Sequence, residues 1–329
     1  MHLTSQRIFE VHNDKNPNVS LSTLVQQLLD AQKRSWPELA AGYDALRDVK
    51  TRTIDCHGIS LILQFNPGRI KSTGAKLDEE SLRSRKCFLC VENLPVEQQG
   101  IVYGDEFLVL CNPAPIFDRH FTIARISHSE QSIGAFPGIF LELARDLSPS
   151  YTMFYNGPRC GASAPDHLHY QACPTDSLPI ETIVSNNSLR IRVKQEANYS
   201  IWRLSSCGRE AIIVECDEKE ETERVLHRLL ETMKKTLGQS EEPMLNILCS
   251  FVDKMWRLML FPRSKHRPDI YYRQGPDRVL ISPAAVDLAG LIITPLQKDF
   301  ATVDATVVEN IFHEVSLDGE SVERILEAL

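Results

Sequence analysis

The segment Asp166-His167-Leu168-His169-Tyr170-Gln171-Ala172 is the most informative part of this chain. It contains a His-x-His-x-Gln triplet. On an extended strand alternate side chains point to one face, so His167, His169 and Gln171 are expected to project together, about 7 Å between neighbours. Two imidazoles and an amide on one face are costly to bury unless they bind something. The triplet therefore predicts a functional site on a strand.

A loop rich in small residues comes just before the triplet. It reads Asn156-Gly157-Pro158-Arg159-Cys160-Gly161-Ala162-Ser163. Small residues let backbone N–H groups approach an anion closely. A loop able to hold phosphate, followed by a strand with a nucleophilic imidazole, predicts transfer of a phosphorus group through a covalent histidine.

The composition is that of an ordinary soluble enzyme, with 43% hydrophobic and 24% charged residues among 329. This length suits two domains or one large two-lobed domain. The net charge of −8 argues against general nucleic-acid binding. Two basic islands interrupt the acidic chain: Arg69, Lys71, Lys76, Arg83, Arg85 and Lys86, and then Arg257, Arg263, Lys265, Arg267 and Arg273. They fit a small polyanionic ligand, although solvated surfaces would look the same.

The sequence predicts a cytoplasmic protein without a membrane partner. No apolar run approaches the roughly 20 residues of a membrane span, and the segment Met1-His2-Leu3-Thr4-Ser5-Gln6-Arg7 lacks the apolar core of a signal peptide. The nine cysteines, an odd number, are expected to be reduced thiols.

Hydrophobic periodicity predicts an α+β protein. Helices are expected at 20–34, 38–49, 134–147 and 218–237 and in the last 25 residues. Strands are expected as a pair within 51–67 and at 107–111, 121–126, 151–155, 189–193, 199–204, 211–215, 244–251, 254–261, 279–282 and 291–294.

A weak internal repeat aligns 116–128 with 254–266. Both copies resemble a strand that ends in Arg-x-x-His, with Arg125 matching Arg263 and His128 matching His266. This pattern predicts an internal duplication. The second copy has no histidine triplet after it, so only the first lobe is expected to carry out chemistry.

The chain also contains Cys87-Phe88-Leu89-Cys90. Two thiolates separated by two residues form half of a tetrahedral zinc site. The nearest downstream histidines that could complete it are His120, His128 and His167. A redox pair or two packed thiols remain alternatives.

Three blocks occur in the order known from one family. They are Leu61-Ile62-Leu63-Gln64-Phe65-Asn66-Pro67-Gly68-Arg69-Ile70-Lys71, then Cys87-Phe88-Leu89-Cys90, then Gly161-Ala162-Ser163 through Gln171. Together they resemble galactose-1-phosphate uridylyltransferase and its relatives in the histidine-triad superfamily. The amino-acid sequence of the third block is also similar to that of the dinucleoside-tetraphosphate phosphorylases and the GDP-hexose phosphorylases. The motif-level resemblance covers about residues 50–175.

The resemblance implies two lobes of the histidine-triad type, each an antiparallel sheet with packed helices. The expected divisions are a helical extension at 1–50, a catalytic lobe at 51–188 and a non-catalytic lobe at 189–329. The resemblance further implies a structural zinc ion.

The resemblance also assigns roles to residues. His169 would be the nucleophile and Gln171 would hydrogen-bond the phosphate; a glutamine in that place points to transfer or phosphorolysis rather than hydrolysis. His167 would be a zinc ligand. The other implied residues are Cys87, Cys90 and His128 for zinc, with His120 as competitor to His128, Gly161 and Ser163 for the phosphate loop, and Arg69 and Lys71 for phosphate charge. Apart from the resemblance, Asn156 at the start of the small-residue loop and Arg263 and Lys265 in the second basic island are further candidates for binding substrate, with a surface turn as the alternative for the second island.

The chain departs from the uridylyltransferase pattern in two places. The family's His-Pro-His is His-Leu-His here, and the spacing from Ser163 to His167 is one residue longer. The expected function is therefore nucleotidyl transfer or phosphorolysis on a nucleoside-diphosphate-sugar or a dinucleoside polyphosphate. A sugar-1-phosphate uridylyltransferase and a catalytically inactive nucleotide-binding protein are the alternatives. Asp166 would be a partner of an imidazole or only a turn residue, and a homodimer is left open.

Overall fold

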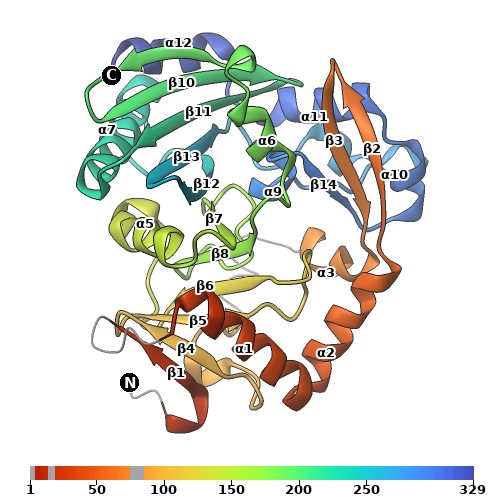
Figure 1. Cartoon of the computed structure of the whole chain (residues 1–329). Helices are drawn as coiled ribbons and strands as arrows, with labels where there is room; N and C mark the ends of the chain where they lie inside the picture. The colour runs from red at the N-terminus through yellow and green to blue at the C-terminus, as the bar shows by residue number, and fades with distance from the viewer. Residues whose placement is uncertain (1–3, 14–18, 75–84) are drawn as a thin grey trace.

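In the computed structural model of the chain, the described residues are 4–13, 19–74 and 85–329. An 11-stranded sheet runs through the whole molecule in the order β1-β4-β5-β6-β8-β7-β12-β13-β11-β10-β9 (Figure 1). All of its neighbouring strands are antiparallel except β1 and β4, which are parallel. The strands are β1 (Ile8–His12), β4 (Gly100–Tyr103), β5 (Phe107–Cys111), β6 (Phe121–Arg125), β7 (Tyr151–Asn156), β8 (His169–Pro174), β9 (Ile191–Gln195), β10 (Tyr199–Ser206), β11 (Arg209–Cys216), β12 (Leu245–Val252) and β13 (Met255–Pro262).

The strand order is a mirror image about the contact between β7 and β12. On one side it reads β4-β5-β6-β8-β7, and on the other β9-β10-β11-β13-β12. Each half carries one long helix between its third and fourth strands in the chain, α5 (Pro137–Asp146) and α7 (Lys219–Leu237). This order sets β6 against β11 and β8 against β13. The sequence alignment of 116–128 with 254–266 instead pairs β6 with β13, so it disagrees with the pairing that the strand order indicates.

A second sheet of three strands joins distant parts of the chain. Its order is β14 (Leu291–Thr294), β3 (Ile59–Phe65) and β2 (Lys50–Cys56). The predicted hairpin is confirmed: β2 and β3 are antiparallel, and His57 and Gly58 turn between them with φ of 56° and 80°. β14 lies parallel to β3 on its other side. The hairpin is thus separate from the large sheet.

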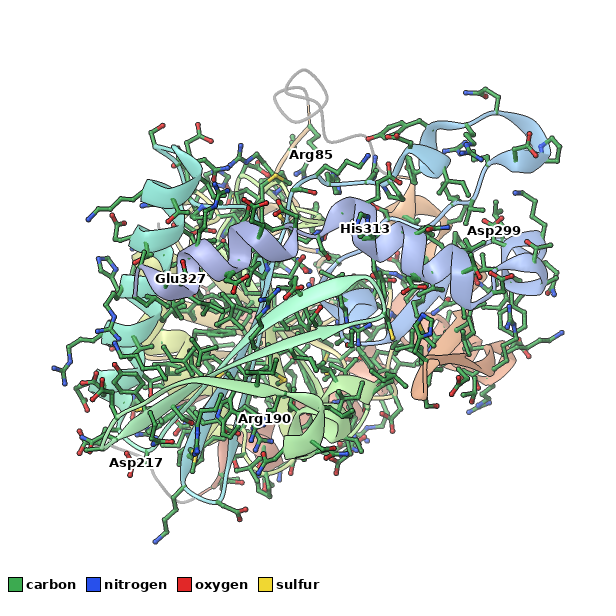
Figure 2. The ribbon with its side chains drawn as sticks, turned by 90° about the horizontal axis from the view of Figure 1, so that it is seen from above. Arg85, Arg190, Asp217, Asp299, His313 and Glu327 are labelled. Carbon is green, nitrogen blue, oxygen red and sulfur yellow. The ribbon has the colours of Figure 1, made fainter. Side chains whose placement is uncertain are left out.

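Two hydrophobic cores cover the two faces of the large sheet. Alternation along β7 places Met153 and Tyr155 in one core and Phe154 in the other. The first core is covered by α1 (Leu21–Ser35), α2 (Pro37–Asp44), α5, α7 and α12 (Gly319–Glu327). The second is covered by the small sheet, α6 (Pro179–Ser185), α9 (Ala285–Leu288) and α11 (Ala305–Val315). Figure 2 shows α12, with Glu327, and α11, with His313, one after the other across the molecule, and Asp299 beyond them.

The long helices have the boundaries that their sequences predict. The Ser20 hydroxyl caps α1 by accepting a hydrogen bond from Thr23 N, and α7 ends at Gly238, whose φ is 63°. The short helices are α3 (Ile70–Thr73), α8 (Asp269–Tyr272) and α10 (Gln297–Thr302). No described helix combines the length and the apolar character that crossing a membrane requires.

One predicted strand is absent and two strands were not predicted. Residues 279–282 form no strand, because the N–H of Leu280 donates to the Asp299 carboxylate (2.8 Å) instead of to a neighbouring strand. β1 and β4 were not predicted from the sequence.

Candidate active site

A cavity of about 530 Å³ brings most of the predicted site residues together. Its walls come from the large sheet, from the segment after β3 and from the C-terminal half of the chain. Of the predicted residues it is lined by Arg69, Asn156, Gly161, Ser163, His169 and Gln171. His169 and Gln171 alternate along β8, which confirms that they share one face of that strand.

The His169 imidazole is buried, 3% exposed, and its protonation is set by its neighbours. Its Nδ1 lies 2.8 Å from the carbonyl oxygen of His167. A carbonyl oxygen only accepts, so Nδ1 carries the proton and Nε2 keeps its lone pair. Burial lowers the pKa of His169 to about 4, so the ring is neutral at pH 7.

Gln131, which was not predicted as a site residue, holds the strand around His169. Its side chain accepts from His169 N (2.8 Å) and donates to His169 O (3.0 Å). The same amide group donates to Asn156 O (2.9 Å) on β7. The buried Gln131 amide therefore ties β7 and β8 together beside the cavity.

The orientation of the Gln171 amide is also set by a neighbour. Its Oε1 lies 2.9 Å from Nε2 of His120. The other ring nitrogen of His120, Nδ1, accepts from Ile116 N (3.2 Å), so Nε2 is the protonated atom and donates to Gln171. Burial and the charge of Arg69 lower the pKa of His120 to about 3, which keeps it neutral. Gln171 is left with its NH₂ group to offer to a ligand.

The loop before β8 is suited to an anion. Within the described part of the chain, the backbone N–H groups of 161–164 donate to no protein acceptor. Gly161 has a φ of +94°, and a Cβ there would lie 2.8 Å from the Cβ of Ala284. A glycine is needed at this position both for its backbone conformation and for the close approach of the wall.

Two arginines of the first basic island reach the cavity. Arg69 donates to Ala114 O (2.7 Å), and burial lowers its pKa to about 10, so it remains a cation at neutral pH. Arg85, which was not assigned a role, pairs with Asp166 (2.9 Å) and lies over the ring of Phe88. Asp166 therefore lies in a turn as the partner of an arginine rather than of an imidazole. The side chain of Lys71, and Lys76 and Arg83 altogether, fall outside the described residues.

The two residues predicted from the second basic island, Arg263 and Lys265, are not among those that line the cavity. Arg263 is 2% exposed and lies behind the cavity wall, and Lys265 pairs with Asp269 and Glu314 outside it. The next two residues of the same turn, His266 and Arg267, line the cavity. A turn has no period from which the inward-facing residues could be predicted.

Cys87, Cys90, His128 and His167 form one cluster, with ligand atoms within 4.8 Å of one another. Sulfur and Nδ1 are separated by 3.2 Å for Cys87 and His167, and by 3.2 Å for Cys90 and His128. His120 lies elsewhere, against Gln171. Of the two candidate histidines, the structure therefore brings His128 to the thiols.

The chemistry of this cluster fits a metal ion such as zinc. In a tetrahedral zinc site with ordinary bond lengths, sulfur and nitrogen ligands lie about 3.5 Å apart. Nε2 of His167 lies 2.7 Å from Arg125 O, and it donates to that oxygen, which leaves Nδ1 free to bind. Burial and the neighbouring Cys87 raise the pKa of Cys90 to about 12, so its thiolate needs a cation beside it.

The cluster and the cavity are linked through one residue. His167 offers its ring to the cluster and its carbonyl oxygen to Nδ1 of His169 (2.8 Å). Whatever fixes the position of His167 therefore also fixes the orientation of the His169 ring. His167 itself precedes β8, so only two members of the triplet face the cavity.

Two family models match consecutive parts of the chain. Residues 28–174 match the Domain of unknown function (DUF4922), and residues 174–329 match the GDPGP1-like, C-terminal domain. A comparison with curated proteins gives no match.

Solved structures of a yeast enzyme share the fold at low sequence identity. The yeast Ap4A phosphorylase Apa2 is 16% identical with a TM-score of 0.53, over 85% of this chain and 94% of that one. The same enzyme in complex with Ap4A is 15% identical with a TM-score of 0.51, over 86% and 97%. A uridylyltransferase is 12% identical with a TM-score of 0.37, over 64% and 86%.

The resemblance predicted from the three blocks is confirmed. Residues 174–329 match the GDPGP1-like, C-terminal domain, and over 85% of its length the chain shares the fold of the yeast Ap4A phosphorylase Apa2.

Proposed function

We propose that this protein is a nucleotidyltransferase that works by transfer to a phosphate acceptor, or phosphorolysis, on a nucleoside-diphosphate-sugar or a dinucleoside polyphosphate. The observation that carries the proposal is the neutral imidazole of His169 in the wall of the cavity. Its Nδ1 carries the proton and donates it to the carbonyl oxygen of His167, which leaves the lone pair of Nε2 for attack on phosphorus. Nucleotide ligands are supported by the yeast relative, whose structures are in complex with AMP and with Ap4A.

The reaction has two steps with balanced bonds. In the first, Nε2 of His169 attacks the α-phosphorus; an N–P bond forms and the P–O bond to the leaving phosphate breaks. In the second, an oxygen of the acceptor phosphate attacks the same phosphorus; a P–O bond forms and the N–P bond breaks, which returns the lone pair to Nε2. Such transfers depend on positioning and charge stabilisation.

The surrounding residues supply that stabilisation. The N–H groups of 161–164 and the NH₂ group of Gln171 would hold the non-bridging oxygens, and Arg69 would offset their charge. Gln171 cannot exchange a proton as an imidazole can, so water is activated poorly. An anionic acceptor held by cations should discharge the intermediate faster.

A zinc ion bound by Cys87, Cys90, His128 and His167 belongs to the proposal as a structural element. Four protein ligands leave no open position, so the metal would supply rigidity rather than chemistry. It would stabilise the two thiolates and hold His167, whose carbonyl oxygen accepts the proton of His169 Nδ1.

We also interpret the mirrored strand order as an internal duplication. The divisions remain those expected from the sequence, 1–50, 51–188 and 189–329, except that the hairpin β2–β3 completes a sheet with β14 of the second lobe. The cytoplasmic location and a homodimer stay predictions.

Intact-mass spectrometry tests the covalent step. The protein is incubated with several nucleoside-diphosphate-sugars and with Ap4A, and the mass gained identifies the nucleotide. The adduct should form on the wild type and on a His227→Ala control, whose histidine is exposed on α7, and should be absent from His169→Ala. An adduct that persists in His169→Ala would overturn the mechanism. Nucleotide binding without any adduct would support the inactive nucleotide-binding alternative.

The acceptor is tested by nucleotide release. Adding inorganic phosphate or a sugar 1-phosphate should accelerate release at least ~10-fold, about 1.4 kcal/mol in barrier. Equal rates with and without acceptor would mean a hydrolase. Release with a sugar 1-phosphate alone would favour the uridylyltransferase alternative.

A further inference from the structure

The turn after β13 lines the cavity with residues whose role has not yet been assigned. Its inward-facing members are His266 and Arg267. They come from the C-terminal half of the chain, whereas the nucleophile and the phosphate loop come from the N-terminal half. Both halves of the chain therefore contribute polar side chains to the cavity.

The turn is held in place by a buried cation. Nη2 of Arg263 donates to the carbonyl oxygens of Lys265 (3.0 Å) and His266 (2.9 Å). Nη1 donates to Asn246 Oδ1 (2.6 Å) and to Pro283 O (3.0 Å). Arg263 is 2% exposed, and its hydrogen bonds are made to the protein itself. The turn therefore has its conformation before any ligand binds.

His266 lines the cavity and has an unsatisfied ring nitrogen. This atom, Nε2, is buried and has no hydrogen-bond partner among the described residues. A buried polar atom without a partner is destabilising, and a ligand that bonds it after a small movement of the ring would recover that loss. Burial and the charges of Arg267 and Arg263 lower the pKa of His266 to about 4, so the ring is neutral at pH 7.

Arg267 adds a fixed positive charge. Its Nε donates to Ser282 Oγ (2.9 Å), its Nη2 to Thr73 O (3.4 Å), and its guanidinium lies 4.3 Å over the ring of Tyr271. These contacts remove most of the entropy that a flexible arginine would lose on binding an anion.

One acidic side chain, that of Asp287, is among the described residues that line the cavity. Its oxygens accept from Ala284 N (2.9 Å) and Ile293 N (3.0 Å), and burial raises its pKa to about 6. The described lining therefore carries this one carboxyl group beside three arginines, Arg69, Arg85 and Arg267.

We propose that His266 and Arg267 form the subsite for the acceptor phosphate. The proposal rests on the function above: once the α-phosphate is bound to His169, the second anion needs a separate place, and the preformed turn supplies one hydrogen-bonding ring and one cation for it. The ligand is a phosphate group, either free inorganic phosphate or the phosphate of a sugar 1-phosphate.

The test separates the two steps of the reaction. The nucleotidyl-enzyme is formed first, isolated, and then discharged with increasing inorganic phosphate or sugar 1-phosphate. His266→Ala and Arg267→Ala should form the adduct at close to the wild-type rate. The acceptor concentration for half-maximal discharge should rise about 10- to 100-fold, the effect of one lost hydrogen bond to a charged group.

Lys265→Ala is the matched control, because Lys265 belongs to the same turn but pairs with Asp269 and Glu314 outside the cavity. It should discharge like the wild type. If an alanine variant fails to fold, the milder variants His266→Asn and Arg267→Lys replace it in the test. They should raise the acceptor concentration for half-maximal discharge as well, but by a smaller factor.

The outcomes distinguish this inference from the proposed function. No adduct on the wild type would refute the function itself. A normal adduct that His266→Ala and Arg267→Ala discharge like the wild type with both acceptors would refute the subsite alone. Slowed adduct formation with normal discharge would also refute it, since the turn would then bind the leaving group. A defect confined to one of the two acceptors supports the subsite and identifies the phosphate source.

Discussion

Replacing His120 by asparagine should slow formation of the nucleotidyl-enzyme. His120 is 1% exposed and contacts its two partners through different nitrogens, accepting from Ile116 N (3.2 Å) and donating to Gln171 Oε1 (2.9 Å). An asparagine ends near the position of Nδ1 and can keep the first bond. It is too short to keep the second.

The size of the effect follows from what Gln171 loses. Without the donor from His120, its amide can rotate and turn its oxygen, rather than its NH₂ group, toward the phosphate. One hydrogen bond to a charged group is worth about 1.5–3 kcal/mol. The rate of adduct formation should therefore fall about 10- to 100-fold.

Single-turnover intact-mass measurements provide the assay, with His120→Gln as the matched variant. A glutamine reaches the position of Nε2 and keeps the donor to Gln171, so it should react faster than His120→Asn. Thermal unfolding of both variants controls for loss of the fold. If His120→Asn reacts as fast as the wild type, or His120→Gln is as slow as His120→Asn, the orientation argument fails.

Three further outcomes are expected. The rate of adduct formation should stay level from neutral pH down toward pH 4 and fall below it, because the pKa of His169 is lowered to about 4 and only the neutral ring attacks; a midpoint near 6.5 in the pH–rate profile would contradict the burial argument. Elemental analysis should find about one zinc per chain, reduced in Cys90→Ser, whereas metal-free wild type purified without chelator would refute the metal site. Gly161→Ala should impair adduct formation, since its Cβ would lie 2.8 Å from that of Ala284 and its φ is +94°; an unchanged rate in a single-turnover assay would mean that the loop does not hold the phosphate.

The sequence was sufficient where a period or a short motif governs the structure. The long amphipathic stripe of α7 and the alternation of His169 and Gln171 along β8 are local patterns, and each predicted its outcome. The parallel pairing of β3 with β14 depends on contacts between distant segments, so no local pattern reports it.

The choice between His120 and His128 shows what sequence alone could not decide. The two histidines lie just before and just after β6, whose five residues separate them by about 17 Å. His120 is buried and His128 is exposed, and only the end of the strand next to His128 faces the thiols. Which end does so depends on the position of 85–90 in the fold.

For the second basic island, the sequence predicted which segment reaches the cavity but not which of its residues do so. Charge identified the turn, but Arg263 supports it from behind while Arg267 faces the cavity. Selecting between them requires knowing which backbone carbonyl groups the buried guanidinium must satisfy, and these are defined only by the folded turn.

The pairing of β3 with β14 has a consequence for how the protein is made. β3 ends at Phe65, and its second neighbour begins only at Leu291. At ~5–20 residues per second, a ribosome needs roughly 10 to 50 seconds to synthesise the stretch between them. Throughout this interval one edge of the hairpin is unpaired and Leu61 and Leu63 lack part of their cover, which makes the segment prone to pairing with other nascent chains. Ile293 of β14 also lines the cavity, so the cavity is completed only after nearly all of this chain has left the ribosome.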